Sequence, residues 1–294
     1  MANKPWFLPL SILYLAITSQ VAVATESFSE LEFGFDHISY QEQLSDVGRI
    51  GNDGKLEQSV SVTNPTIRNL SYSNINDHWG LIVRGSSTVA TSLADEQWSV
   101  GKHGVIQENE FKLKQAEIGV ALAYQLSKTW QIAGGANFTS SGFTRSNFTK
   151  VEPGASRFAA AIAPATFDTF AGAINEDQYA FLATLLLRYD TRTLAENSPW
   201  SYYAELGTSV PLYVLIQNTS LPNDSLSDSF NGWGINGGVG ARYQLNEKVS
   251  IKLGLHSQYS ERNHIQKMSG ETRIRVPNIS YTTLGAGLGI SWGF

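Results

Sequence analysis

The chain of 294 residues contains no cysteine, only two methionines and no excess of positive charge. The absence of cysteine excludes disulfides and thiolate-ligated metal sites. Its formal net charge of −5 argues against nucleic acid as a partner. Beyond residue 24 the chain also lacks any run of about eighteen apolar residues, which excludes a bundle of transmembrane helices.

Glycine and aromatic residues are abundant instead, with 26 Gly, 14 Phe, 12 Tyr and 7 Trp. The mean hydropathy is nevertheless close to neutral, at −0.16. A transmembrane β-barrel gives such averages because only alternate residues of each strand contact lipid. Composition therefore favours an all-β membrane protein over a helical membrane protein or a soluble enzyme.

The last nine residues show a strict alternation. Ala286, Leu288, Ile290, Trp292 and Phe294 are separated by single Gly or Ser residues. This period of two predicts a β-strand with one apolar face and one face of small residues. A final Phe with an aromatic residue two positions earlier resembles the C-terminal strand that Gram-negative outer-membrane proteins present to their barrel-assembly machinery. The resemblance implies an outer-membrane β-barrel, with Leu288, Ile290, Trp292 and Phe294 as its assembly signal.

The first 24 residues have the features of a signal peptide. Lys4 precedes an apolar run over residues 6–16, and Ala22-Val23-Ala24 forms a small-residue cleavage site. A membrane anchor is the alternative, but the apolar run is too short to span a bilayer comfortably. We expect cleavage after Ala24, leaving one domain over residues 25–294 whose formal charge moves from −5 to −6 as Lys4 is lost.

Alternating patterns continue along the chain and predict an up-and-down antiparallel barrel of ten strands, with eight and twelve as alternatives. The strands are predicted over residues 29–43, 57–73, 78–91, 111–126, 130–144, 177–190, 199–217, 230–245, 249–262 and 279–294. Short periplasmic connections are predicted around residues 73–77, 127–129, 191–198 and 246–248. Long outer loops are predicted around residues 44–56, 92–110, 145–176, 218–229 and 263–278.

Aromatic residues recur at the periplasmic ends of these strands. Trp and Tyr favour the membrane interface, where the ring meets acyl chains and the polar edge meets water. The sequence therefore predicts a periplasmic girdle of Tyr72, Trp79, Tyr124, Trp130, Tyr189, Trp200, Tyr243 and Trp292.

The same alternation predicts small and charged side chains inside the barrel. Six charged residues are expected to form a network in the lumen: Arg84, Glu117, Arg188, Glu205, Arg242 and Lys252. Glu32 and Asp36 are expected to face inward as well. With a turn over residues 246–248, Arg242 would lie opposite Lys252, and like charges facing each other need neutralisation. We therefore expect Glu117, Glu205 or Glu32 near that pair, in a network that plugs the barrel or forms a path for a small solute.

Two segments depart from the simple pattern. Phe33 and Phe35 share one face of the first strand whereas Ile38 and Tyr40 fall on the other, so we expect a bulge near Asp36-His37. Residues 158–174 of the third outer loop are too apolar for a freely solvated loop, and Pro164 interrupts any helix there. This loop is expected to enter the barrel mouth, to pack on other loops or to contact a partner.

Catalytic patterns are incomplete. Ten-stranded barrels include the omptin proteases, whose outer rim carries paired Asp and an Asp/His motif, but in Asp36-His37 and Asp77-His78 adjacent side chains diverge across the sheet. Outer-membrane lipases and lipid A deacylases carry His and Ser two positions apart on one strand. Here Ser260 shares the face of His256 but lies about 13 Å away along it, too far for proton transfer.

The sequence thus predicts an outer-membrane barrel without catalytic activity, cofactor or metal. In the first hypothesis it is a closed anchor whose loops contact lipopolysaccharide, surface polysaccharide or another protein. A narrow channel for small solutes is the second hypothesis, and a surface protease or lipid hydrolase is the third. In length the chain also resembles a solitary autotransporter translocator barrel, but that family has twelve strands and an internal helix, for which residues 25–29 are too short.

Overall fold

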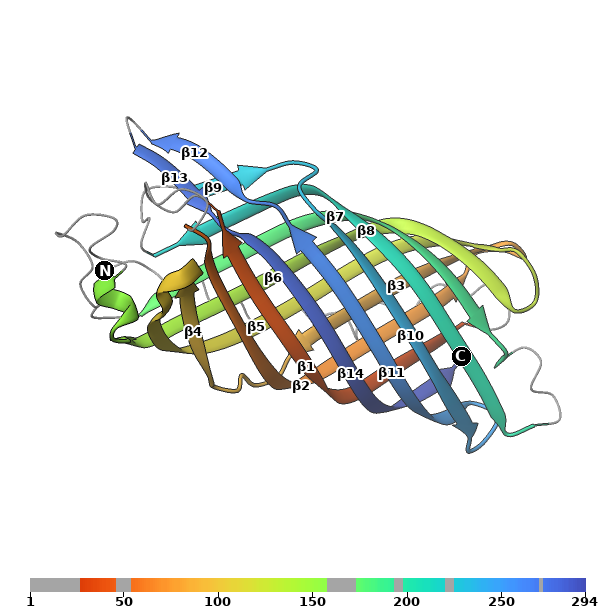
Figure 1. Ribbon diagram of the computed structural model, residues 1–294. Helices are drawn as coiled ribbons and strands as arrows, with labels where there is room; N and C mark the ends of the chain where they lie inside the picture. The colour runs from red at the N-terminus through yellow and green to blue at the C-terminus, as the bar shows by residue number, and fades with distance from the viewer. Residues whose placement is uncertain (1–26, 46–53, 158–172, 193–197, 220–224, 270–271) are drawn as a thin grey trace, which may run out of the picture.

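The computed structural model describes residues 27–45, 54–157, 173–192, 198–219, 225–269 and 272–294. The expected signal peptide and most of the apolar third loop lie outside these ranges. Within them the chain forms a closed antiparallel β-barrel of ten strands (Figure 1). None of the helices in the described ranges is long and apolar enough to cross a membrane.

The barrel is built from strands that are neighbours in sequence. In chain order they are β1 (Phe28–Leu44), β2 (Leu56–Asn74), β3 (Trp79–Thr88), β4 (Ala94–Val100), β5 (Gly104–Gln125), β6 (Trp130–Lys150), β7 (Ile174–Asp190), β8 (Trp200–Asn218), β10 (Trp233–Gln244), β11 (Val249–Arg262) and β14 (Asn278–Gly293). Strands β3 and β4 share one position between β2 and β5, and β1 pairs with both β2 and β14. This last pairing closes the barrel.

Three further strands lie at the end of the barrel with the long connections. Strand β9 (Ser225–Asp228) pairs antiparallel with the outer end of β8, and β12 (Ile265–Ser269) pairs with β13 (Thr272–Val276) in a separate hairpin. The short turns lie at the opposite end, together with the start of β1 at Phe28 and the end of β14 at Gly293. In outer-membrane barrels the short turns face the periplasm, so we name the two ends outer and periplasmic accordingly.

The predicted all-β fold and its ten strands are confirmed, but some details are wrong. The predicted loop over residues 92–110 is mostly strand: β4 pairs with β2 and β5, and the three residues Gly101–His103 make the turn. The predicted bulge in β1 is absent, because its registers with β2 and β14 run without a shift. Ile38 and Tyr40 simply continue the inward face of Glu32 and Asp36, and the lumen is apolar at their height.

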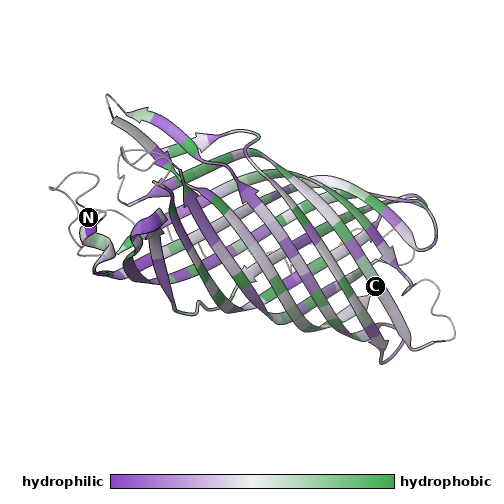
Figure 2. Cartoon of the chain, in the orientation of Figure 1, coloured by the Kyte–Doolittle hydropathy of each residue, from purple (hydrophilic) through white to green (hydrophobic). Residues whose placement is uncertain are grey.

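Hydrophobic and hydrophilic residues alternate along the barrel strands (Figure 2), and many of the large hydrophobic side chains are exposed on the outside. Phe33, Phe35 and Leu253 are each 58% exposed or more, although a soluble protein would bury such side chains. They alternate with buried inward-facing residues along the same strands. A large apolar surface of this kind is the lipid-facing surface of a transmembrane barrel.

Most of the predicted girdle residues lie on this outward face near the periplasmic end. They contact one another in pairs across neighbouring strands, with ring centroids 4.9–5.0 Å apart: Trp79 with Tyr124, Trp130 with Tyr189, and Trp200 with Tyr243. Tyr72 is an error in the prediction. It is buried inside the barrel and stacks on Phe28, because β2 turns its even-numbered residues toward the lumen.

Strand β14 separates its two faces as the sequence predicts. Leu288, Ile290 and Phe294 are more than half exposed on the outside, with Trp292 half-buried between its neighbours β1 and β11. Glycine is required on the other face because β1 places a carboxylate against it. A Cβ atom on Gly287 would lie 2.3 Å from Glu32 Oε1, so any larger residue would displace this interior side chain.

Candidate functional site

The lumen is the candidate site because it holds most of the buried charge of the described residues. Its layers follow the inward-facing residues of β1 from the periplasmic to the outer end: Phe28, Glu30, Glu32, Asp36, Ile38, Tyr40 and Glu42. Beyond the apolar layer of Phe28, the chemistry therefore changes from charged to apolar and back to charged along the barrel axis.

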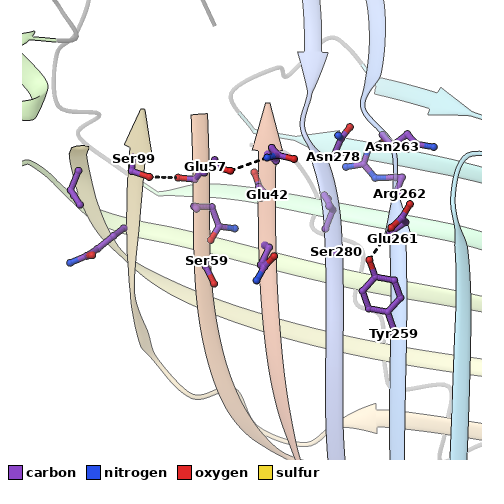
Figure 3. Close-up of a pocket in the computed structure, with 16 residues that line it drawn as sticks. Glu42, Glu57, Ser59, Ser99, Tyr259, Glu261, Arg262, Asn263, Asn278 and Ser280 are labelled. Carbon is purple, nitrogen blue, oxygen red and sulfur yellow. Dashed lines mark hydrogen bonds between the residues drawn. The ribbon is translucent and has the colours of Figure 1, made fainter. Parts of the chain in front are cut away.

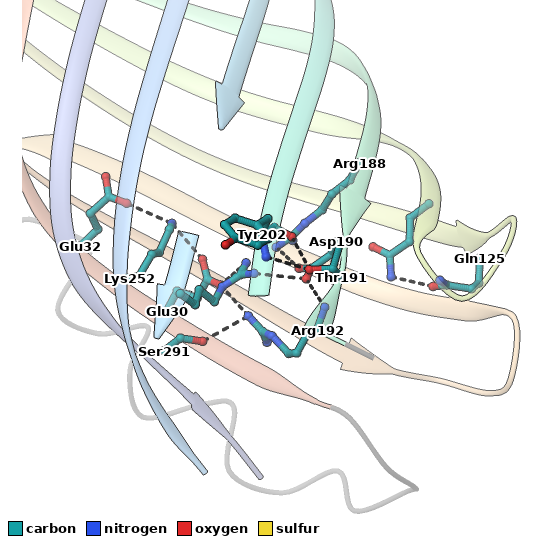
Figure 4. A network of polar contacts seen from close by, with 12 residues as sticks. Glu30, Glu32, Gln125, Arg188, Asp190, Thr191, Arg192, Tyr202, Lys252 and Ser291 are labelled. Carbon is teal, nitrogen blue, oxygen red and sulfur yellow. Dashed lines mark hydrogen bonds and ion pairs between the residues drawn. The ribbon is translucent and has the colours of Figure 1, made fainter. Parts of the chain in front are cut away.

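Six residues near the periplasmic end form what we call the periplasmic charge cluster (Figure 4): Glu30, Arg188, Asp190, Arg192, Arg242 and Lys252. Glu30 lies at its centre and is 2% exposed. Its carboxylate contacts Arg242 at 2.7 Å, Arg192 at 2.8 Å and Lys252 at 2.9 Å. Three cations on one carboxylate compensate for the cost of burying it.

Asp190 is the second acid of the cluster. It contacts Arg188 at 3.1 Å and Arg242 at 3.2 Å. Arg242 thus joins Asp190 on β7 to Glu30 on β1, strands that are five positions apart in the ten-strand circuit and face each other. Arg192 lies beyond β7 in the periplasmic connection, where burial and then the charge of Arg242 lower its pKa to about 10. The cluster therefore spans the lumen from wall to wall.

The six charged residues predicted from the sequence do not form one network. Arg188, Arg242 and Lys252 join the periplasmic charge cluster, and Arg242 lies opposite Lys252 as predicted. Of the acids expected near that pair, Glu32 contacts Lys252 at 3.0 Å. Arg84 and Glu117 instead face each other at 3.6 Å in a separate pair.

Glu205 is the sixth predicted residue and stands apart. It is the cross-strand partner of Arg188 in the β7–β8 register. Its carboxylate makes no ion pair or hydrogen bond with another described residue. Glu205 nevertheless lines the same cavity as Arg84 and Glu117. Its partner Arg188 turns toward Asp190 and the ring of Phe28 instead.

A second constellation lies one level above the periplasmic charge cluster. Asp36 accepts a 2.7 Å hydrogen bond from His256 Nε2. Both of its carboxylate oxygens also accept hydrogen bonds from Arg68 Nη2. Arg68 reaches Glu32 at 3.5 Å, which links this trio to the level below. A histidine held by a carboxylate is oriented, but Ser257, the neighbour of His256 in sequence, faces the opposite side of the sheet.

Four aromatic rings fill the middle of the lumen and form what we call the aromatic layer: Tyr40, Phe111, Phe143 and Tyr281. The Tyr40 ring lies 4.8 Å from Phe143 and 5.1 Å from Tyr281 between centroids. Tyr40 belongs to β1 and Phe143 to β6, strands on far sides of the barrel. Tyr40 and Phe111 are fully buried, so water has no access to their surfaces.

Arg145 covers the outer side of the aromatic layer. It donates hydrogen bonds to Glu96 on β4, at 2.8 Å from Nε, and to Glu42 on β1. Its guanidinium carbon lies 5.4 Å from the Phe111 ring centroid, a cation–π distance. Tyr40 also donates to Glu42. This group is a second lumen-spanning polar contact, at the outer end.

Two cavities flank these layers. A chamber of about 170 Å³ lies inside the barrel between the aromatic layer and the periplasmic charge cluster. A groove of about 620 Å³ lies at the outer ends of β1, β2, β11 and β14 (Figure 3). Its wall consists mainly of polar side chains that alternate with inward-facing residues: Gln41, Gln43, Glu57, Ser59, Tyr259, Glu261, Asn278 and Ser280.

The geometry of the catalytic candidates matches their sequence pattern. In β1, Asp36 faces the lumen whereas His37 faces outward and contacts Thr63 at 3.0 Å. Asp77 and His78 lie in the periplasmic turn between β2 and β3. The described residues contain no group of three or more His, Asp or Glu side chains placed to hold a metal ion.

Sequence reasoning missed several residues of the lumen. Glu30 shares the parity of Glu32 and Asp36, so an additional step along β1 would have found it. Arg145 shares the parity of Phe143, but the predicted strand ended at residue 144. Asp190 shares the parity of Arg188 at the end of its predicted strand, so the same step would have found it. Arg192 carries no comparable signal, since a turn does not fix the direction of its side chain.

Comparison with known proteins agrees with the fold. No protein-family model matches the sequence, and no curated protein matches it either. Among solved structures, the outer membrane protease OmpT of Escherichia coli superimposes with a TM-score of 0.66 at 10% identity, over 94% of this chain and 99% of that chain. This likeness confirms the predicted outer-membrane β-barrel fold.

Two other outer-membrane barrels match with lower scores. The translocator domain of the autotransporter NalP from Neisseria meningitidis has a TM-score of 0.39 at 7% identity, over 97% of this chain and 93% of that chain. OprG from Pseudomonas aeruginosa has a TM-score of 0.31 at 14% identity, over 91% of this chain and 96% of that chain.

Proposed function

We propose that this chain is a closed outer-membrane barrel that anchors an extracellular contact surface and conducts no solute across the membrane. The contact between Tyr40 and Phe143 carries the proposal, because it joins β1 to β6 across the lumen. The periplasmic charge cluster below it and Arg145 above it span the lumen independently. A solute would have to displace all three layers in turn.

The outer end supports the role in contacts because it has a hydrophobic core of its own. Val214 and Ile216 of β8, Leu226 of β9, Ile265 of β12 and Val276 of β13 pack together there. This packing holds β9 and the β12–β13 hairpin against the barrel rim (Figure 1). A structured rim can present a defined surface to a partner.

The polar groove at the outer end suggests what this surface contacts. Its amide, hydroxyl and carboxylate groups can exchange hydrogen bonds with sugar hydroxyls, and the Tyr259 ring offers a face for stacking. We therefore propose the saccharide part of lipopolysaccharide or a surface polysaccharide as the partner, with an extracellular protein as the alternative.

The biogenesis that we propose rests on two sequence features, the signal-like pattern of residues 1–24 and the alternating pattern of residues 286–294. Export by a Sec-type signal and cleavage after Ala24 would deliver the chain to the periplasm. The strand ending at Phe294 would then be recognised by the barrel-assembly machinery of a Gram-negative outer membrane. We further propose that the barrel performs no hydrolysis, since Ser257, the serine next to His256, faces the opposite side of the sheet and no nucleophile joins the His256–Asp36 pair among the described residues.

Single-channel recording of refolded residues 25–294 in a planar bilayer tests the closed barrel. We expect no steady conductance steps from the intact protein, and an increased leak from Phe143→Ala. Phe138→Ala is the matched control, because Phe138 lies on the same strand but is 46% exposed on the lipid side. Heat-modifiable migration on gels would verify that each variant is folded. Steady conductance from the intact protein would overturn the proposal in favour of a narrow channel.

A further inference from the structure

The chamber inside the barrel is not needed for the anchoring function proposed above. It lies between the aromatic layer and the periplasmic charge cluster, and residues from nine of the ten strand positions line it. Its volume of about 170 Å³ compares with about 30 Å³ for one water molecule in the liquid. The chamber therefore has room for a solute of about six heavy atoms.

Arg188 is the first sign of a ligand. Its side chain is 2% exposed and lines the chamber, yet two of its donors, Nε and Nη1, have no hydrogen-bond partner. Only Nη2 is bonded, to Asp190 at 3.1 Å. Buried donors without partners are rare in folded proteins, because each one loses its hydrogen bonds to water. Two on one charged group indicate an acceptor from outside the chain.

Glu205 is the second, independent sign. Its carboxylate lines the same chamber and has no ion pair or hydrogen bond with any described residue. Glu205 and Arg188 are cross-strand neighbours in the β7–β8 register, so their backbones are adjacent. The chamber thus presents a guanidinium with free donors beside a carboxylate with free acceptors.

The remaining charges of the wall are balanced. Arg84 faces Glu117, Arg68 faces Glu32, and Lys252 contacts Glu30 and Glu32. A simple anion would satisfy Arg188 but would approach the unpaired charge of Glu205. A ligand with a negative and a positive group a few ångströms apart satisfies both residues.

We propose that the chamber binds a small zwitterion of the α-amino acid class, with its carboxylate on Arg188 and its ammonium on Glu205. A compound of the size of alanine has six heavy atoms and fits the available volume. The aromatic layer lies on the outer side, so the ligand enters from the periplasmic side, where the ion pairs of the periplasmic charge cluster must open to admit it. This site is independent of the extracellular contacts, and a barrel that conducts no ions can still hold such a ligand.

Calorimetric titration of the folded barrel in detergent with L-alanine, propionate and ethylamine tests the site. Propionate lacks the ammonium group of alanine and ethylamine lacks its carboxylate. We expect saturable binding of L-alanine, with the two analogues at least about tenfold weaker, because each loses one charge-assisted contact. Arg188→Gln should weaken L-alanine binding by a similar factor. Glu205→Gln should make L-alanine and propionate bind equally.

Lys114→Gln is the matched control, since it removes one charge from an exposed position of β5 that faces away from the lumen. It should leave L-alanine binding unchanged. Equal affinity of the intact protein for L-alanine and propionate would overturn the proposal in favour of a plain anion site. No saturable binding at all would show that the chamber holds only water. Both outcomes come from the intact protein, so they decide even if a variant fails to fold.

Discussion

The periplasmic and outer halves of the lumen close the same barrel by different means. In the periplasmic half, ion pairs span the lumen through Glu30, Asp190 and Arg242. In the outer half, the aromatic layer meets in the centre and a single guanidinium, that of Arg145, covers it. Rings pack to full density, whereas ion pairs require fixed directions and leave space between them. The difference explains why the chamber lies in the charged half.

Strand β14 shows how the sequence produces this difference. Its inward-facing positions are Gly285, Gly287 and Gly289 in the charged half, but Tyr281 and Ile279 in the outer half. The glycines leave room for the long polar side chains of neighbouring strands. A Cβ on Gly285, for example, would lie 1.9 Å from His256 Nε2. Small residues on one strand therefore accommodate large charges on its neighbours.

The largest effect is expected from Glu30→Gln. This change leaves Arg192, Arg242 and Lys252 around a neutral amide in a buried site, so the free energy of unfolding should fall by about 3–5 kcal/mol. Urea unfolding in phospholipid vesicles, followed by tryptophan fluorescence, measures it. Glu117→Gln, in the separate and more accessible pair with Arg84, serves as the control. Equal losses in the two variants would contradict the central role assigned to Glu30.

Removing a ring of the aromatic layer should destabilise the barrel nearly as much. Phe143→Ala removes a buried ring and leaves a cavity, which should cost about 3–5 kcal/mol of unfolding free energy. The same urea titration should give a distinctly smaller loss for the lipid-facing Phe138→Ala, because lipid can fill the space that the ring leaves. A loss no greater than that control would mean that the layer packs loosely.

Two glycine substitutions test the same comparison, with smaller expected changes in the free energy of unfolding. Gly287→Ala should cost about 1–3 kcal/mol, because its Cβ would collide with Glu32 in the charged half. Gly134→Ala, whose Cβ would meet no atom within 4 Å, should stay within about 0.5 kcal/mol of the parent. The ordering of the two urea midpoints is the result to check, and a reversal would contradict the described position of Glu32.

The smallest effect is expected from Arg84→Gln. Arg84 and Glu117 are 3.6 Å apart and each about one-quarter exposed, so water already screens their attraction. The free energy of unfolding should fall by less than about 1 kcal/mol. A loss comparable to that of Glu30→Gln would show that the two groups of charges act as one network after all.

Alternation along the sequence was sufficient to predict the ten strands, the lipid-facing band and most of the girdle. The errors have local causes. Tyr72 was assigned to the girdle from its residue type, although its parity places it in the lumen beside Phe28. The extended hairpin of β4 and β5 was missed because its strands rise past the membrane band, where both faces of a strand carry polar residues.

The sequence by itself determined which side chains enter the lumen, because in a strand successive residues point to opposite faces. It also placed Arg242 opposite Lys252, since a short turn fixes the register of one hairpin. Only the tertiary structure decided which charges meet across the barrel. Glu30 is far from Asp190 and Arg242 in sequence, and they become neighbours only when β1 pairs with β14 and closes the circuit. Closure and strand tilt are properties of the whole sheet, and no single strand carries them.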